Sequence, residues 1–166
     1  MNKSICTDKI NIKTKARKIS LKINLITLKE DMKKYCCRAV ELGASDAKII
    51  PVKYITLDER VRLKCAVPRC HLYGESANCP PNVPPVSEIR TIFKKYKNAV
   101  LFKCDVIPKE DFVDDEKWKT GHIMHQNKIH KIATSIESLA FNDGYYFATG
   151  FGAGGCKTTL CNGQFC

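Results

Sequence analysis

Six of the ten cysteines lie in two short segments, and thiolates are soft ligands suited to zinc or to iron–sulfur clusters. The first segment has the pattern C-x4-C-x8-C, and the second has the pattern C-x4-C-x4-C. The predicted metal and cofactor ligands are Cys65, Cys70, Cys79, Cys156, Cys161 and Cys166. Since the two segments are far apart in the sequence, the fold must bring them together to make one shared site, and two partial sites remain an alternative.

The residues around these cysteines favour an iron–sulfur cluster over zinc. Neither segment has the C-x2-C spacing of common zinc ribbons, and Cys79 precedes Pro80, as ligands in bacterial ferredoxins often do. Small residues at 152–155 would let backbone N–H groups approach sulfur. Cations that would offset thiolate charge flank the first segment: Arg62, Lys64 and Arg69. We expect an iron–sulfur cluster of the 4Fe–4S type, with zinc as the alternative.

The other cysteines have a different setting. Cys36 and Cys37 fall inside a predicted helix and Cys104 inside a predicted strand, which favours core packing, because unligated cysteine behaves as a small apolar residue. Cys6 lies in a basic leader and indicates no chemistry.

Composition indicates one ordinary globular domain of 166 residues, with no apolar run long enough for a membrane span and no secretory signal. We therefore expect a cytoplasmic protein, where dense cysteine indicates metal or redox chemistry rather than disulfides. The net charge is +11, but residues 1–22 hold +6 of it. We predict a basic, flexible leader over 1–26 and a single Cys-rich metal-binding domain over 27–166. A nucleic-acid partner is not expected, although a nucleic-acid binder that uses the leader is a third hypothesis.

Strands and helices alternate in the predicted element order. Thr27 and Glu30 form a capping box, and Gly43 is expected to end that helix. Strands are predicted at 19–26, 47–52, 98–106 and 145–149, and helices at 27–42, 87–96 and 114–141. This order predicts an α/β fold with a small, largely parallel sheet of three to four strands, flanking helices and two Cys-rich loops. Each Cys segment would then leave the carboxyl edge of the sheet, where such folds place their sites.

Two runs of sequence carry a family resemblance: VRLKCAVPRCHLYGESANCPPNVPPVSE and GYYFATGFGAGGCKTTLC. From Thr27 onward the chain resembles a prokaryotic family of unknown function described as predicted metal-binding proteins. The resemblance implies the same six cysteine ligands in a metal-binding domain with no settled reaction. Family members continue into a segment with Cys-Arg-His-Pro and a serine–methionine run, whereas this sequence stops at Cys166. We therefore expect a fragment or a truncated gene product, in which at least one ligand would be missing.

Other sequence patterns are weaker indications of a functional site. Residues 150–158 approach a phosphate-binding loop, but Cys156 separates the glycine from the lysine that the motif needs side by side. His122 and His125 share a helix face without a completing carboxylate, so solvated or core-edge histidines are expected. His71 adjoins Cys70 and could replace a thiolate, although a position outside the ligand shell is favoured. The acidic run at 111–116 indicates a helix start.

These observations predict a metal-binding protein with an electron-transfer or redox accessory role and a redox partner protein. The alternative is a structural zinc module that shapes an interaction surface and has no redox activity. The sequence assigns no catalytic residue, no substrate and no oligomeric state.

Overall fold

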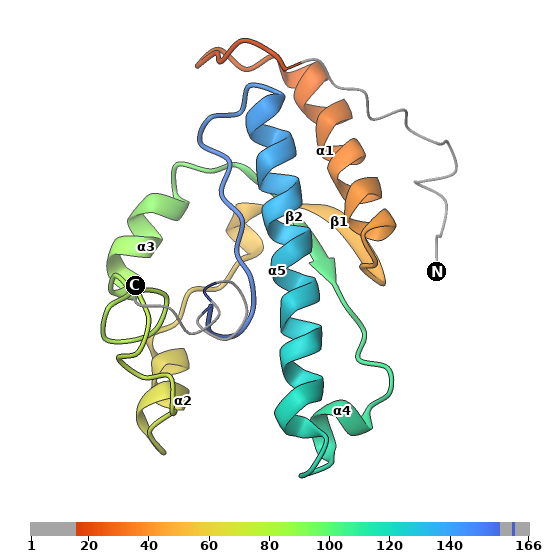
Figure 1. The fold of residues 1–166 in the computed structure, drawn as a ribbon. Coiled ribbons are helices and arrows are strands. Elements are labelled where there is room, and N and C mark those ends of the chain that lie inside the picture. The colour runs from red at the N-terminus through yellow and green to blue at the C-terminus, as the bar shows by residue number, and fades with distance from the viewer. Residues whose placement is uncertain (1–15, 157–160, 162–166) are drawn as a thin grey trace. The chain divides into compact units, whose positions relative to one another are not determined.

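The computed structural model describes residues 16–156 and residue 161 (Figure 1). The described chain divides into two compact units. Unit 1 contains residues 16–49 and 100–152, and unit 2 contains residues 50–99, 153–156 and 161. Most of the predicted basic leader, residues 1–15, lies outside the described residues.

The described elements are five α-helices, two short 3-10 helices and two strands. In chain order they are α1 (Leu25–Glu41), β1 (Asp46–Pro51), η1 (Val52–Tyr54), η2 (Glu59–Arg62), α2 (Leu63–Ala66), α3 (Val86–Phe93), β2 (Asn98–Lys103), α4 (Glu110–Val113) and α5 (Trp118–Asn142).

Helix α1 begins two residues earlier than the capping-box pattern predicts. The Asn24 side chain accepts hydrogen bonds from the N–H groups of Ile26 and Thr27, at 2.9 and 3.2 Å, and so satisfies two amides at the helix start. The predicted strand over 19–26 is therefore wrong. Gly43 follows the helix with a φ of +103°, a left-handed conformation that glycine adopts without strain, as the sequence predicts for the helix end.

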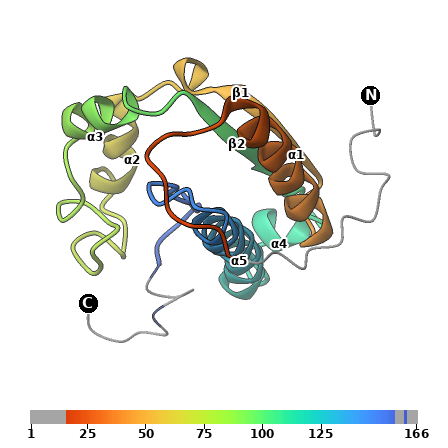
Figure 2. The ribbon, with the colours of Figure 1, turned by 90° about the horizontal axis from the view of Figure 1, so that it is seen from above.

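The sheet has two antiparallel strands, so the prediction of a largely parallel sheet of three to four strands is wrong (Figure 2). Ser45 N–H donates to the Lys103 carbonyl at 2.8 Å, and Val52 N–H donates to the Lys97 carbonyl at 3.0 Å. Because residue numbers rise along one strand while they fall along the other, the two strands run in opposite directions. The third strand predicted at 145–149 is also wrong, since this segment forms a turn.

The apolar core of unit 1 lies where α1, α5 and the sheet meet. Ala39, Ala44 and Ile132 are buried and in contact, and α1 packs along α5 (Figure 1). Partly buried side chains surround this cluster: Leu42, Ala47, Phe102, Cys104 and Ile136. The small alanines allow α1 and α5 to approach closely, and Ile132 fills the space between them.

A cluster of charged side chains joins α1 to the end of α5. The Asp143 carboxylate, with a side chain 2% exposed, accepts hydrogen bonds from Lys34 and from the Tyr35 hydroxyl, the latter at 2.8 Å. Arg17 lies 3.3 Å from the same carboxylate, and its N–H donates to the Asn142 carbonyl at 2.7 Å. Unit 1 therefore binds part of the basic segment to its helices.

Asp31 extends this cluster. Its carboxylate accepts hydrogen bonds from Arg17 and, at 2.7 Å, from the Tyr145 hydroxyl. Burial opposes the charged form of Asp31, but these hydrogen bonds and the nearby Lys34 outweigh it and lower the pKa of the carboxyl. The buried carboxylates of unit 1 are thus paired with cations and hydroxyl groups, as buried charges must be.

The helix predicted over 114–141 corresponds to α5, and the short helix α4 precedes it. Asp114 accepts hydrogen bonds from the N–H groups of Glu116 and Lys117, both at 3.0 Å, so the acidic run does mark the start of α5. Gly121 packs against α4, because a Cβ atom there would lie 2.6 Å from the Asp111 Cβ. None of the helices in the described part of the chain is long and apolar enough to cross a membrane.

Candidate metal centre

The described part of both Cys segments lies in unit 2. Cys65 belongs to α2, Cys70 and Cys79 follow in the loop before α3, and Cys156 and Cys161 come from the carboxyl-terminal part of the unit. Cys166 lies outside the described residues. The two segments are therefore in one compact unit, although the route predicted for them, the shared edge of a parallel sheet, does not exist.

The same backbone hydrogen bond closes both C-x4-C segments. Cys70 N–H donates to the Cys65 carbonyl at 2.9 Å, and Cys161 N–H donates to the Cys156 carbonyl at 3.2 Å. Each bond brings the backbones of two cysteines together across four intervening residues. Both pairs are thus arranged as loops from which two sulfurs could bind one metal ion or cluster.

Cys79 is held by consecutive tight turns. Its N–H donates to the Ser76 carbonyl at 3.1 Å, and its carbonyl accepts from Asn82 N–H at 3.0 Å. Gly74 has a φ of +84°, and its N–H donates to the Pro80 carbonyl at 2.7 Å. Because prolines interrupt any regular element here, these local bonds satisfy the backbone and fix the position of Cys79.

The glycine-rich stretch before Cys156 packs against the turn that holds Cys79. A Cβ atom at Gly155 would lie 2.5 Å from Leu72 Cδ1 and 3.6 Å from Cys79 Sγ. Only a glycine fits there without displacing a neighbour, because 2.5 Å is far shorter than a contact between two carbon atoms. Cys79 and Cys156 are both buried, at 9% and 6% exposed. The two segments therefore meet through Gly155.

The donor type of these residues fits a soft metal, and so does their placement in one unit. Within residues 16–156 and 161, however, no three or more side chains of His, Cys, Asp or Glu come together as a group that could hold a metal ion. A closed ligand shell thus does not form from the described side chains alone.

Comparison with known families decides the family. Residues 48–166 match the family described as predicted metal-binding protein (DUF2284). The chain belongs to the DUF2284 family. The matched segment contains all of unit 2, with every predicted ligand, and leaves out α1. Comparisons with curated proteins and with solved structures give no match.

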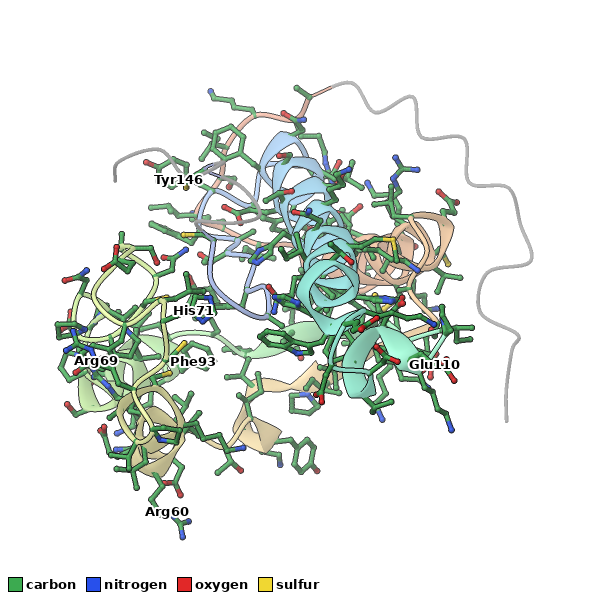
Figure 3. The ribbon with its side chains drawn as sticks, turned by 60° about the horizontal axis from the view of Figure 1, so that its bottom comes forward. Arg60, Arg69, His71, Phe93, Glu110 and Tyr146 are labelled. Atoms are coloured by element: carbon green, nitrogen blue, oxygen red, sulfur yellow. The ribbon has the colours of Figure 1, made fainter. Side chains whose placement is uncertain are left out.

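Membership of the DUF2284 family thus makes this chain a predicted metal-binding protein. The basic residues near its thiols have differing surroundings. The Arg69 guanidinium lies over the Tyr73 ring, 5.1 Å from the centroid, so this contact orients it on the thiol loop. Arg60 pairs with Asp58 at 2.6 Å and points away from the loop, whereas Arg69 and the exposed His71 lie on it (Figure 3). Arg69 therefore remains a cation that could offset thiolate charge.

Two of the three histidines of α5 have side-chain or backbone partners of their own, whereas the buried Nε2 of His130 has none among the described residues. His122 bonds to the Trp118 carbonyl and stacks on the Trp118 ring, with centroids 4.3 Å apart. His125 is buried, and its Nε2 lies 2.9 Å from Asp111 Oδ2. This pairing is absent from the sequence prediction, which treats Asp111 only as part of a helix start. Its spacing of fourteen residues across α4 and α5 gives no local signal.

The cysteines predicted as core residues differ from those of unit 2. Cys36 and Cys37 are buried in α1, and Cys104 packs against the core of unit 1. Burial, with a smaller effect of Asp46, raises the pKa of the Cys36 thiol to about 11, and burial also raises the pKa of Cys104. Both thiols therefore stay protonated at neutral pH, which disfavours metal binding because the ligand is the thiolate.

Proposed function

We propose that this protein binds an iron–sulfur cluster through thiolates of both Cys segments and transfers electrons to a partner protein. The observation that carries the proposal is the approach of Gly155 to Cys79, because it joins the two segments within one unit of a metal-binding family. A bound cluster would supply reversible one-electron oxidation and reduction.

Cysteines of unit 2 would bind such a cluster, and residues around them would shield it and tune it. Cys65, Cys70 and Cys79 are the core ligands, and one or more cysteines of the second segment complete the set. Burial of Cys79 and Cys156 limits the access of water to two of the sulfurs. The absence of a side chain at Gly155 leaves backbone close to sulfur, where N–H groups tune a cluster.

The test is anaerobic purification of the full chain, followed by iron and acid-labile sulfide analysis and by electron paramagnetic resonance of the reduced protein. We expect stoichiometric iron and sulfide, which Cys79→Ala removes. Cys104→Ala is the matched control, because this thiol packs against the unit 1 core, and it should retain the cluster. A colourless protein with stoichiometric zinc would reject the proposal.

A structural zinc site is the second candidate, and one observation favours it. The two C-x4-C pairs closed by matching hydrogen bonds provide four thiolates, the number that a tetrahedral structural zinc site needs. Exposure to air separates the two candidates. A zinc site keeps its metal in air, whereas an accessible iron–sulfur cluster loses its colour.

A further inference from the structure

Ser76 lies inside the thiol loop of unit 2 with its hydroxyl group buried and unbonded. The residue is 1% exposed, and its Oγ has no hydrogen-bond partner among the described residues. Buried hydroxyl groups nearly always have a partner, since losing water without a replacement costs free energy. An orphan hydroxyl beside predicted metal ligands therefore indicates a partner that arrives with the metal.

The carbonyl of Ser76 accepts two hydrogen bonds, whereas its hydroxyl makes none among the described residues. The Ser76 carbonyl accepts from Cys79 N–H at 3.1 Å and from Asn82 Nδ2 at 3.0 Å. Ser76 and Cys79 are thus the first and last residues of one β-turn, whose ends lie within about 7 Å of each other. These two hydrogen bonds therefore hold the backbone of Ser76 close to that of a predicted ligand.

We propose that the Ser76 hydroxyl donates a hydrogen bond to the sulfur of Cys79 once a metal has converted that thiol into a bound thiolate. A neutral thiol is a weak acceptor, whereas an anionic sulfur is a strong one, so the bond forms only in the loaded protein. This inference rests on the proposed metal binding and adds a positioning residue to it. Ser76 orients the ligand and stabilises negative charge on the cluster.

Ser76→Ala should therefore have opposite effects on the metal-free and the metal-bound protein: it should not destabilise the former, and it should weaken metal retention in the latter. Without metal, the variant loses an unsatisfied group, so its midpoint of thermal unfolding should be unchanged or higher. With metal, it loses a hydrogen bond to a charged acceptor, so it should release metal to a competing chelator about tenfold more readily. Ser87→Ala is the matched control, because Ser87 is exposed on α3 in the same unit.

A reduction potential gives a readout that a purely structural role would not move. A hydrogen bond to sulfur stabilises the reduced, more negative cluster. We expect Ser76→Ala to weaken the preference for the reduced form about tenfold, which for one electron is a midpoint potential lower by about 59 mV. Ser87→Ala should keep the potential of the unchanged protein.

The experiment uses the full chain, reconstituted anaerobically in parallel with ferrous iron plus sulfide and with zinc. If iron loads and Ser76→Ala matches Ser87→Ala in metal release and potential, the inference on Ser76 is overturned and the iron–sulfur proposal stands. If only zinc loads and Ser76→Ala releases it faster, the iron–sulfur proposal fails and Ser76 keeps its role. Lower thermal stability of Ser76→Ala in both forms, or no loading at all, overturns the inference.

Discussion

The two units of this chain stabilise their interiors in different ways. Unit 1 has an apolar cluster of Ala39, Ala44 and Ile132, and its buried carboxylates are matched by cations and tyrosine hydroxyls. The buried residues of unit 2 are few, and thiols and an orphan hydroxyl are prominent among them: Val52, Ser76, Cys79 and Cys156. Unit 1 pairs its buried carboxylates with its own side chains, although the buried Nε2 of His130 has no hydrogen-bond partner among the described residues, whereas unit 2 has thiols whose proposed partner is a metal.

This contrast teaches that the stability of unit 2 should depend on the metal far more than that of unit 1. A loop-rich segment with little apolar burial gains little from the hydrophobic effect, and the proposed thiolate site would supply the missing free energy. Each of the following changes tests one side of the contrast.

Metal removal should produce the largest effect. A structural thiolate site contributes about 10 kcal/mol or more of apparent binding free energy, so a strong chelator should expose the amides of unit 2. Hydrogen exchange followed by mass spectrometry should show fast exchange over 63–82, with α1 and α5 still protected. Equal loss of protection in both units would contradict the contrast.

Asp143→Ala should be the most damaging substitution in unit 1. It removes the nearly fully buried carboxylate that Lys34 and Arg17 contact in addition to Asp31, and breaking such a buried pair costs about 3 kcal/mol. Urea denaturation, followed by the fluorescence of Trp118 as the one tryptophan, measures the change.

Glu41→Ala is its matched control, because Glu41 pairs with Arg38 on the surface of α1. We expect a loss below about 1 kcal/mol. Similar losses for the two variants would show that the buried cluster contributes no more to the stability of unit 1 than a surface ion pair does.

Gly155→Ala should weaken metal retention by about tenfold. The added methyl group would lie 2.5 Å from Leu72 Cδ1. Overpacking of this kind costs about 1–3 kcal/mol, and here it would weaken the contact between the two Cys segments. Competition with a chromophoric chelator measures it. Ala153→Ser, an exposed change in the same loop, should bind metal as the unchanged protein does.

Acidification should give the smallest effect, and it should act on unit 1. The pKa of Asp31 is lowered from its ordinary value of 3.8, so its ion pair stabilises the folded state above about pH 4. This stability is lost as the pH falls through the lower folded pKa. Trp118 fluorescence should report the loss, and Asp31→Asn should flatten the dependence on pH below 4. An unchanged slope in that variant would assign the acid sensitivity to other groups.

Helices α1, α3 and α5 and both strands could be predicted from local pattern, but the short helices α2 and α4 and the pairing of the strands could not. Predicted strands at 47–52 and 98–106 correspond to β1 and β2, because apolar and β-branched runs are a local signal. Their antiparallel direction depends on how the long segment between them returns, which periodicity does not record. The aromatic run at 145–149 has strand propensity, yet Tyr145 bonds to Asp31 and Gly150 N–H bonds to Glu137. Tertiary contacts therefore overrode that propensity.

The ligand types of the candidate site stay a prediction from the sequence, which is possible because few side chains suit a soft metal and their spacing is visible there. The contact at Gly155 and the buried hydroxyl of Ser76 were not predictable, since both depend on burial. Serine and glycine are common in loops, and nothing in their spacing distinguishes these two positions from exposed ones.

The matching closure of the two C-x4-C loops has a consequence for how much their sequences can vary. The intervening residues are Ala-Val-Pro-Arg in one loop and Lys-Thr-Thr-Leu in the other, with no identity at any position. Main-chain atoms of the cysteines themselves close each ring. The closure therefore constrains the number of intervening residues but not their identities. Substitutions in these inserts that keep their length of four residues, Arg69 apart, should therefore leave both ring closures intact.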